Sequence, residues 1–83
     1  MTRELFEKIF EETGGNWSGD NCFAGLKIIA KYTNNIVQAA EHDEVFSEYI
    51  DKLVENNITK EDVKSLALLN WSISEHGCLS CFV

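Results

Sequence analysis

The sequence predicts a single small α+β domain over residues 1–83, with about four short helices and a C-terminal β-hairpin. The length of 83 residues allows one domain with a small core. A content of 45% hydrophobic and 11% aromatic residues excludes an intrinsically disordered chain. Apolar residues recur at helical spacing over most of the chain and alternate with polar residues near its end, which predicts helices followed by strands.

Two amphipathic segments open the chain. The first predicted helix covers residues 3–12, with Thr2 as its N-cap and Gly14-Gly15 after its end. Its apolar residues form one stripe made of Leu5, Phe6, Ile9 and Phe10. The second helix is expected from about Asn21 to Tyr32. Its expected apolar face consists of Phe23, Leu26, Ile29 and Ala30.

The strongest helix start lies at residue 60. Thr59 is a candidate N-cap, and Asp62 follows three residues later as in a shortened capping box. Ile58 and Val63 occupy the positions of a hydrophobic staple. A helix is therefore predicted from Lys60 to about residue 70.

The tail after this helix has the pattern of strands. Trp71 and Ile73 alternate with serines, and Gly77 precedes a run of strand formers. This pattern predicts the C-terminal β-hairpin.

Segment 36–57 is compatible with two structures. Its apolar residues fit a helical stripe made of Val45, Phe46, Tyr49, Ile50, Leu53 and Val54, and this periodicity favours one helix. Alternatively, residues 44–47 form a short strand that leads into a helix from about Glu48. The domain would then hold a third short strand beside the hairpin.

The charge of the chain restricts its partners. It contains 14 acidic and 7 basic side chains, a net charge of −7. Direct nucleic-acid binding needs a basic face, so we expect none, and an acidic surface is repelled by anionic lipid. The beginning of the sequence lacks the pattern of a signal peptide, and no apolar run approaches the roughly 20 residues that span a bilayer. We therefore expect a cytoplasmic protein, no membrane contact, and neutral or basic partners, although an acidic surface also serves solubility alone.

An acidic run between residues 41 and 62 is the main candidate for partner binding. If the segment is one helix, Glu44, Glu48, Asp51 and Glu55 form a continuous acidic stripe. Like charges at this spacing destabilise a helix, and a basic partner would relieve the repulsion. The alternative is a solvated helix face balanced in part by Lys52. The predicted partner-binding residues are Glu41, Asp43, Glu44, Glu48, Asp51, Glu55 and Trp17.

Trp17 joins this set because it lies in a loop of small and polar residues. Exposed tryptophans are enriched at binding hot spots. The alternative is that its ring folds back over the small core.

The cysteines suggest a second kind of site. Three cysteines, an odd number, do not predict a disulfide framework in a reducing compartment. Cys78 and Cys81, with His76, are candidate zinc ligands. In a strand, residues 78 and 81 point to opposite faces, so they share a metal ion only if the tail turns. The alternative is that the cysteines are small buried hydrophobes.

Three stretches, Ile58–Ser65, Leu69–Trp71 and Cys78–Val83, carry a resemblance of size, charge and layout. In these respects the chain resembles small acidic orphan proteins of phages and mobile elements. The resemblance implies binding and blocking of a host protein. Some anti-CRISPR and anti-restriction inhibitors of this kind imitate the charge of DNA, and the resemblance implies the same mode of binding. It transfers no functional residue to this chain.

These observations predict a non-catalytic function. The sequence contains no glycine-rich phosphate loop, nucleophile elbow or paired metal carboxylates, so we expect no enzyme. The predicted function is binding of a protein partner through the acidic 41–62 region, in its sharper form inhibition of a nucleic-acid-binding protein by charge imitation. The alternatives are a zinc-stabilised structural module and a homodimer of unknown role.

Overall fold

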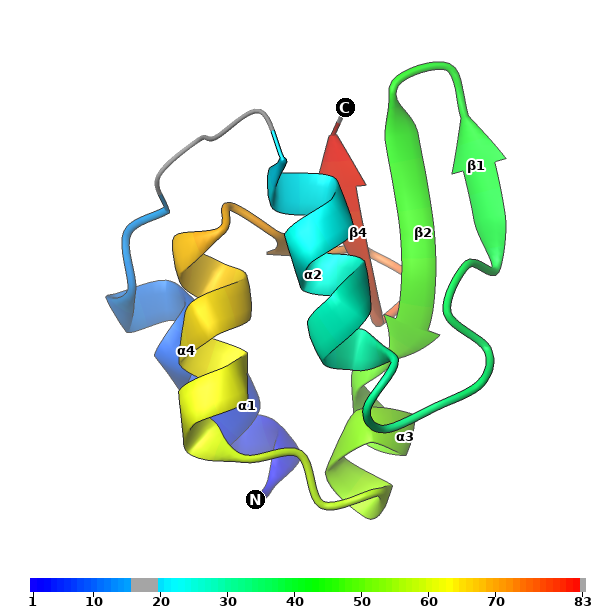
Figure 1. Ribbon diagram of the computed structural model, residues 1–83. Coiled ribbons are helices and arrows are strands. Elements are labelled where there is room, and N and C mark those ends of the chain that lie inside the picture. Colours follow the sequence, from blue (N-terminus) through cyan, green and yellow to red (C-terminus); the bar gives the residue numbers. More distant parts are fainter. Residues whose placement is uncertain (16–19, 83) are drawn as a thin grey trace.

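The computed structural model describes residues 1–15 and 20–82 and confirms the α+β class (Figure 1). Trp17 lies outside the described residues. The helices are α1 (Arg3–Glu12), α2 (Asn21–Ile29), α3 (Ile50–Glu55) and α4 (Lys60–Leu68). The strands are β1 (Ala39–Glu41), β2 (Glu44–Tyr49), β3 (Ser72–Ile73) and β4 (Cys78–Phe82).

The strands form one antiparallel sheet in the order β1-β2-β4-β3. It consists of two hairpins placed side by side, joined where β2 pairs with β4. The β3–β4 pair confirms the predicted C-terminal hairpin. The β1–β2 pair makes the sheet larger than the hairpin and single added strand that the sequence indicated.

Both predicted helix caps are present. The Thr2 hydroxyl accepts a hydrogen bond from the backbone N–H of Leu5 at 3.1 Å, and the Thr59 hydroxyl accepts one from the N–H of Asp62 at 3.2 Å. Each bond satisfies a donor that the first turn of a helix leaves unpaired. Local sequence therefore determines where α1 and α4 begin.

The prediction for the apolar face of α2 was correct at Ile29, which is buried, and at Leu26, which packs against the core, but wrong at Phe23 and Ala30. Phe23 is 66% exposed, and the helix ends at Ile29, before Tyr32. Its buried residues are Asn21, Gly25 and Ile29. The inward face therefore includes Asn21 and Gly25 beside Ile29, because the large side chain of Trp71 occupies the space next to Gly25.

The preferred prediction of one helix over residues 36–57 was also wrong. A strand, β2, leads directly into a short helix, α3, as the alternative proposed. Pairing with β1 on one side and β4 on the other holds β2 extended. This pairing outweighs the helical periodicity, since strand preference depends on neighbours. Asn57, with φ of 65°, lies in the turn after α3, as expected for a residue that tolerates left-handed geometry.

The core lies between the helices and one face of the sheet (Figure 1). Helix α2 packs against β2 and β4, while α1 packs against α4 and α3. The buried cluster contains Phe6, Ile29, Ile50, Leu53, Ile58, Val63, Leu66, Trp71, Leu79 and Cys81. In residues 1–15 and 20–82, none of the helices has the length and apolar character needed to cross a membrane.

Trp71 forms the junction between the helices and the sheet. Its indole N–H donates to the backbone carbonyl of Asn21 at 3.0 Å, and its ring lies against Gly25. The Asn21 amide in turn donates to the carbonyl of Leu69 at 2.9 Å and to the Cys81 sulfur at 3.3 Å. One small cluster therefore joins α2, the end of α4 and strand β4.

A substitution at Gly25 tests this junction. A Cβ atom at Gly25 would lie 2.0 Å from Nε1 of Trp71, so we expect Gly25→Ala to lower the free energy of unfolding by about 2 kcal/mol. Without the clash, alanine would stabilise a helix by about 1 kcal/mol. Gly14→Ala is the control because nothing lies within 4 Å of its Cβ position. Urea unfolding followed by circular dichroism measures both, and stabilisation by Gly25→Ala would contradict the packing.

Asp62 connects α4 to the end of α2. Its carboxylate accepts hydrogen bonds from the Tyr32 hydroxyl and from the Lys31 ammonium, the latter at 2.6 Å. Burial by itself would raise the pKa of Asp62, but the bonds from Lys31, Tyr32 and Thr59 outweigh it and hold that pKa below its usual value. The ionised form is therefore stabilised by folding.

This shift gives a pH dependence with a definite sign. A lowered pKa contributes stability that is present above the ordinary aspartate pKa and is lost as the pH falls through the folded value. We expect Asp62→Asn to reduce the free energy of unfolding by about 1.5 kcal/mol at pH 7. The difference from the parent protein should shrink as the pH falls below about 3.9. Urea midpoints from pH 7 to pH 2.5 measure it, and a difference that ignores pH would refute the assignment.

Candidate functional site

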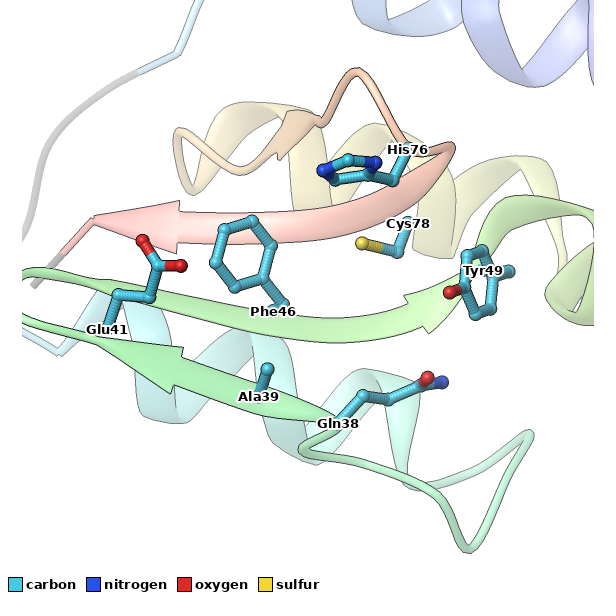
Figure 2. A pocket seen from close by; sticks show the side chains of 7 residues that line it. All are labelled: Gln38, Ala39, Glu41, Phe46, Tyr49, His76 and Cys78. Carbon is cyan, nitrogen blue, oxygen red and sulfur yellow. The ribbon is translucent and has the colours of Figure 1, made fainter.

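One face of the sheet lies away from α2 and α4, and its side chains line two hollows, the first of which is shown in Figure 2. Side chains of directly paired antiparallel residues point to the same face. Ala39 pairs with Phe46, and Tyr49 pairs with Cys78. We call this surface the open sheet face and define it by Ala39, Glu41, Glu44, Phe46, Tyr49, Cys78 and Phe82, with Glu75 and His76 from the β3–β4 turn.

The two hollows adjoin. The first has a volume of about 300 Å³ and is lined by aromatic and small side chains that include Ala39, Phe46 and Tyr49. The second, of about 430 Å³, has a more acidic lining that includes Glu44 and Glu75. Glu41, Phe46 and His76 line both. The hollows therefore form one depression with Phe46 at its centre.

The basic side chains of the protein lie in or beside the helices, whereas acidic side chains occur on both the helices and the sheet. Residues 32–51 and 65–82 contain no lysine or arginine. All seven basic side chains lie in or beside the helices: Arg3, Lys8, Lys27, Lys31, Lys52, Lys60 and Lys64. The acidic residues on the open sheet face therefore have no lysine or arginine on the same strands, and the Arg3 guanidinium lies near Gly77 in the β3–β4 turn.

The predicted acidic residues separate into two groups. Glu41, Asp43 and Glu44 come together where β1 turns into β2, and Asp43 is exposed in the turn. Asp51 and Glu55 lie on α3 instead. Asp51 accepts from Arg3 at 3.0 Å, and Glu55 lies 3.7 Å from Lys52. The continuous helical stripe that the sequence suggested is therefore wrong, because a strand carries its first half.

Glu48 has a structural position. It is only 4% exposed, although it was predicted to contact a partner. Its carboxylate accepts hydrogen bonds from the Thr33 hydroxyl at 2.7 Å, the Gln38 amide at 2.9 Å and the backbone N–H of Tyr49 at 2.9 Å. These bonds tie the loop before β1 to β2, so the carboxylate of Glu48 faces its own chain.

A like-charge pair takes the place of the expected helical repulsion. Glu41 and Glu44 are direct cross-strand partners at the end of the β1–β2 hairpin. Like charges directly opposite each other destabilise a sheet. The repulsion that a basic partner could relieve therefore acts between Glu41 on β1 and Glu44 on β2, and not along a helix.

The structure does not bring the predicted zinc ligands together. Cys78 lines the first hollow with His76, whereas the Cys81 sulfur faces the Asn21 amide on the opposite side of the sheet. Burial, and then the neighbouring Cys22 thiol, raise the pKa of Cys81 to about 12, which keeps it protonated and a poor metal ligand. The described residues include no group of three or more His, Cys, Asp or Glu placed to hold a metal ion. The zinc alternative therefore loses its ligand set.

Several residues of this face were missed from the sequence. Phe46 and Tyr49 were placed in the apolar stripe of a helix, and Glu75 was not connected with the acidic run. Tyr49 is 46% exposed and Phe82 is 51% exposed. The alternation of Val45 and Phe46 between the two faces of β2 was the available signal, and it follows from treating the segment as a strand.

No family model, curated protein or solved structure matches the chain. Residue roles therefore cannot be transferred from a relative to the open sheet face.

Glu44 and Glu48 test the site because their neutralisation should have opposite effects. Glu44→Gln removes the repulsion from Glu41, so we expect it to raise the free energy of unfolding by about 0.5 kcal/mol at low salt. Glu48→Gln removes an ionised acceptor of three hydrogen bonds and should lower it by about 2 kcal/mol. Urea unfolding at two salt concentrations measures both. Equal changes of the same sign would support a solvated helical stripe.

Proposed function

We propose that this protein is a non-catalytic module that binds a basic protein partner through the open sheet face. One observation carries the proposal. A depression with Phe46 at its centre is bordered by the carboxylates of Glu41, Glu44 and Glu75, on two strands and a turn that contain no lysine or arginine. Shape, apolar contact and charge are combined on one surface, which is the composition that protein recognition needs.

The aromatic and acidic residues have separate roles in this proposal. The exposed Tyr49 and Phe82 and the half-buried Phe46 supply apolar contact area, and aromatic side chains are enriched at the centres of interfaces. The carboxylates at the rim accelerate encounter with a positively charged surface and disfavour anionic partners. The net charge of −7 acts in the same direction at longer range.

The sharper form of the proposal is inhibition of a nucleic-acid-binding protein. Surfaces that bind nucleic acid are rich in lysine and arginine that neutralise phosphates. The carboxylates of the open sheet face offer those lysine and arginine side chains anions that replace the phosphates of nucleic acid. The resemblance to small acidic phage proteins supports a host protein as the target.

A second copy of this chain is a poorer occupant of the face. A symmetric dimer uses the same patch on both subunits. Pairing two open sheet faces would place the carboxylates of Glu41, Glu44 and Glu75 against each other without a cation from either set of strands. The charge of the face therefore favours a different protein.

Affinity capture tests the proposed function. The immobilised protein is exposed to a nuclease-treated bacterial lysate and eluted with rising salt or with added DNA. We expect a nucleic-acid-binding protein to be retained and then released by either eluent. The variant Glu41→Gln/Glu44→Gln/Glu75→Gln should retain it about tenfold less, a loss of about 1.4 kcal/mol. The control variant Glu11→Gln/Glu12→Gln/Glu61→Gln removes the same charge from exposed helix positions and should retain it normally.

Two results would contradict the proposal. Equal retention by both variants would separate binding from the open sheet face, and elution that ignores salt and DNA would remove the charge argument. Sedimentation velocity on the same samples gives the mass of the free protein. A dimer that the first variant dissociates and the control preserves would show that a second copy covers the face.

A further inference from the structure

The depression on the open sheet face is large enough to hold one long side chain. Each of its two adjoining parts, of about 300 and 430 Å³, accommodates a side chain with its solvent. Figure 2 shows Phe46 standing between Glu41 on one side and His76 and Cys78 on the other. A ligand in the depression therefore meets an aromatic ring and a carboxylate at once.

The acidic groups around Phe46 are not neutralised within the part of the chain that the structure describes. Neither Glu41 nor Glu44 forms an ion pair with a described lysine or arginine, whereas Asp51, Glu55 and Asp62 each do. The carboxylate of Glu75 lies 3.7 Å from the imidazole of His76, and both side chains remain largely exposed. The depression thus offers several carboxylate oxygens to an incoming cation.

Given the proposed function, on which this inference rests, we propose that the depression binds a single arginine side chain of the partner. The guanidinium lies over the Phe46 ring and among the carboxylates of Glu41, Glu44 and Glu75. The partner is then a protein that presents an exposed arginine as the anchor of its contact.

The combination of ring and carboxylates favours arginine over lysine. A guanidinium has a flat face that stacks on an aromatic ring and in-plane N–H donors that pair with carboxylates, so it uses both features together. It is also more weakly hydrated than an ammonium group, which lowers the cost of entering a partly apolar hollow. Lysine would satisfy the carboxylates and leave the ring without a planar partner.

A peptide titration observed by NMR tests the inference. The probe is the blocked tripeptide acetyl-Gly-Arg-Gly-amide, and the matched probes replace arginine by citrulline or by lysine. At low salt we expect the arginine peptide to shift the amide signals of β1, β2 and the β3–β4 turn. Citrulline, which has the same shape without the charge, should leave them unchanged, and lysine should bind about two- to fivefold more weakly.

Variants of the depression separate its two features. Phe46→Leu keeps apolar volume and removes the ring, so it should abolish the preference for arginine over lysine. Glu41→Gln/Glu44→Gln should weaken binding of both cationic peptides and should keep the protein folded even if Phe46→Leu does not. Glu11→Gln/Glu12→Gln is the control with the same charge change on α1 and should bind like the parent protein.

The outcomes distinguish this inference from the proposed function. Binding of citrulline as strong as arginine, equal binding of lysine, or shifts confined to other surfaces would overturn the arginine site. If that happens while affinity capture still depends on Glu41, Glu44 and Glu75, the partner binds the face by other contacts. If the arginine peptide binds as described while capture shows no dependence on these carboxylates, the arginine site is supported and the proposed function is overturned.

Discussion

Packing of Trp71 against Gly25 is the constraint on which the arrangement of this protein depends. The indole occupies space that any side chain at residue 25 would fill, and its N–H is bonded to the carbonyl of Asn21. Asn21 then uses its amide to bind the end of α4 and the Cys81 sulfur. These contacts determine which face of α2 is buried. They also fix α2 against one face of the sheet, which leaves Phe23 in solvent.

The helices cover only one face of the sheet, so the other face is left uncovered by them. The basic residues lie in or beside the helices, and several of them form ion pairs with nearby carboxylates. The charged residues of the strands are all acidic. The basic side chains are therefore absent from the strands, whereas acidic side chains occur on both layers. The open sheet face gathers several carboxylates around Phe46 on strands that contain no lysine or arginine. The proposed function depends on that concentration of charge more than on the net charge.

The accuracy of prediction from sequence followed the range of the interactions. Thr2 and Thr59 cap their helices as expected, because a cap depends on residues three positions away. The final hairpin was predicted from alternation and a glycine close to its turn. Segment 36–57 failed because its helical periodicity was real but β1 and β4 supplied hydrogen-bonding partners that hold β2 extended. Glu48 failed for a similar reason, since its partners include Thr33, fifteen positions away in the chain.

The sequence by itself determined the α+β class, the starts of α1 and α4, the C-terminal hairpin and the acidic character of the protein. These properties depend on composition and on contacts between near neighbours. Only the tertiary structure decided that Glu41 and Glu44 share a face with Phe46 and Glu75, that Glu48 is buried, and that Cys78 and Cys81 point apart. Strand pairing decides these positions. A strand places successive side chains on opposite faces, whereas a helix places residues three and four apart on one face, so the two structures group different side chains together.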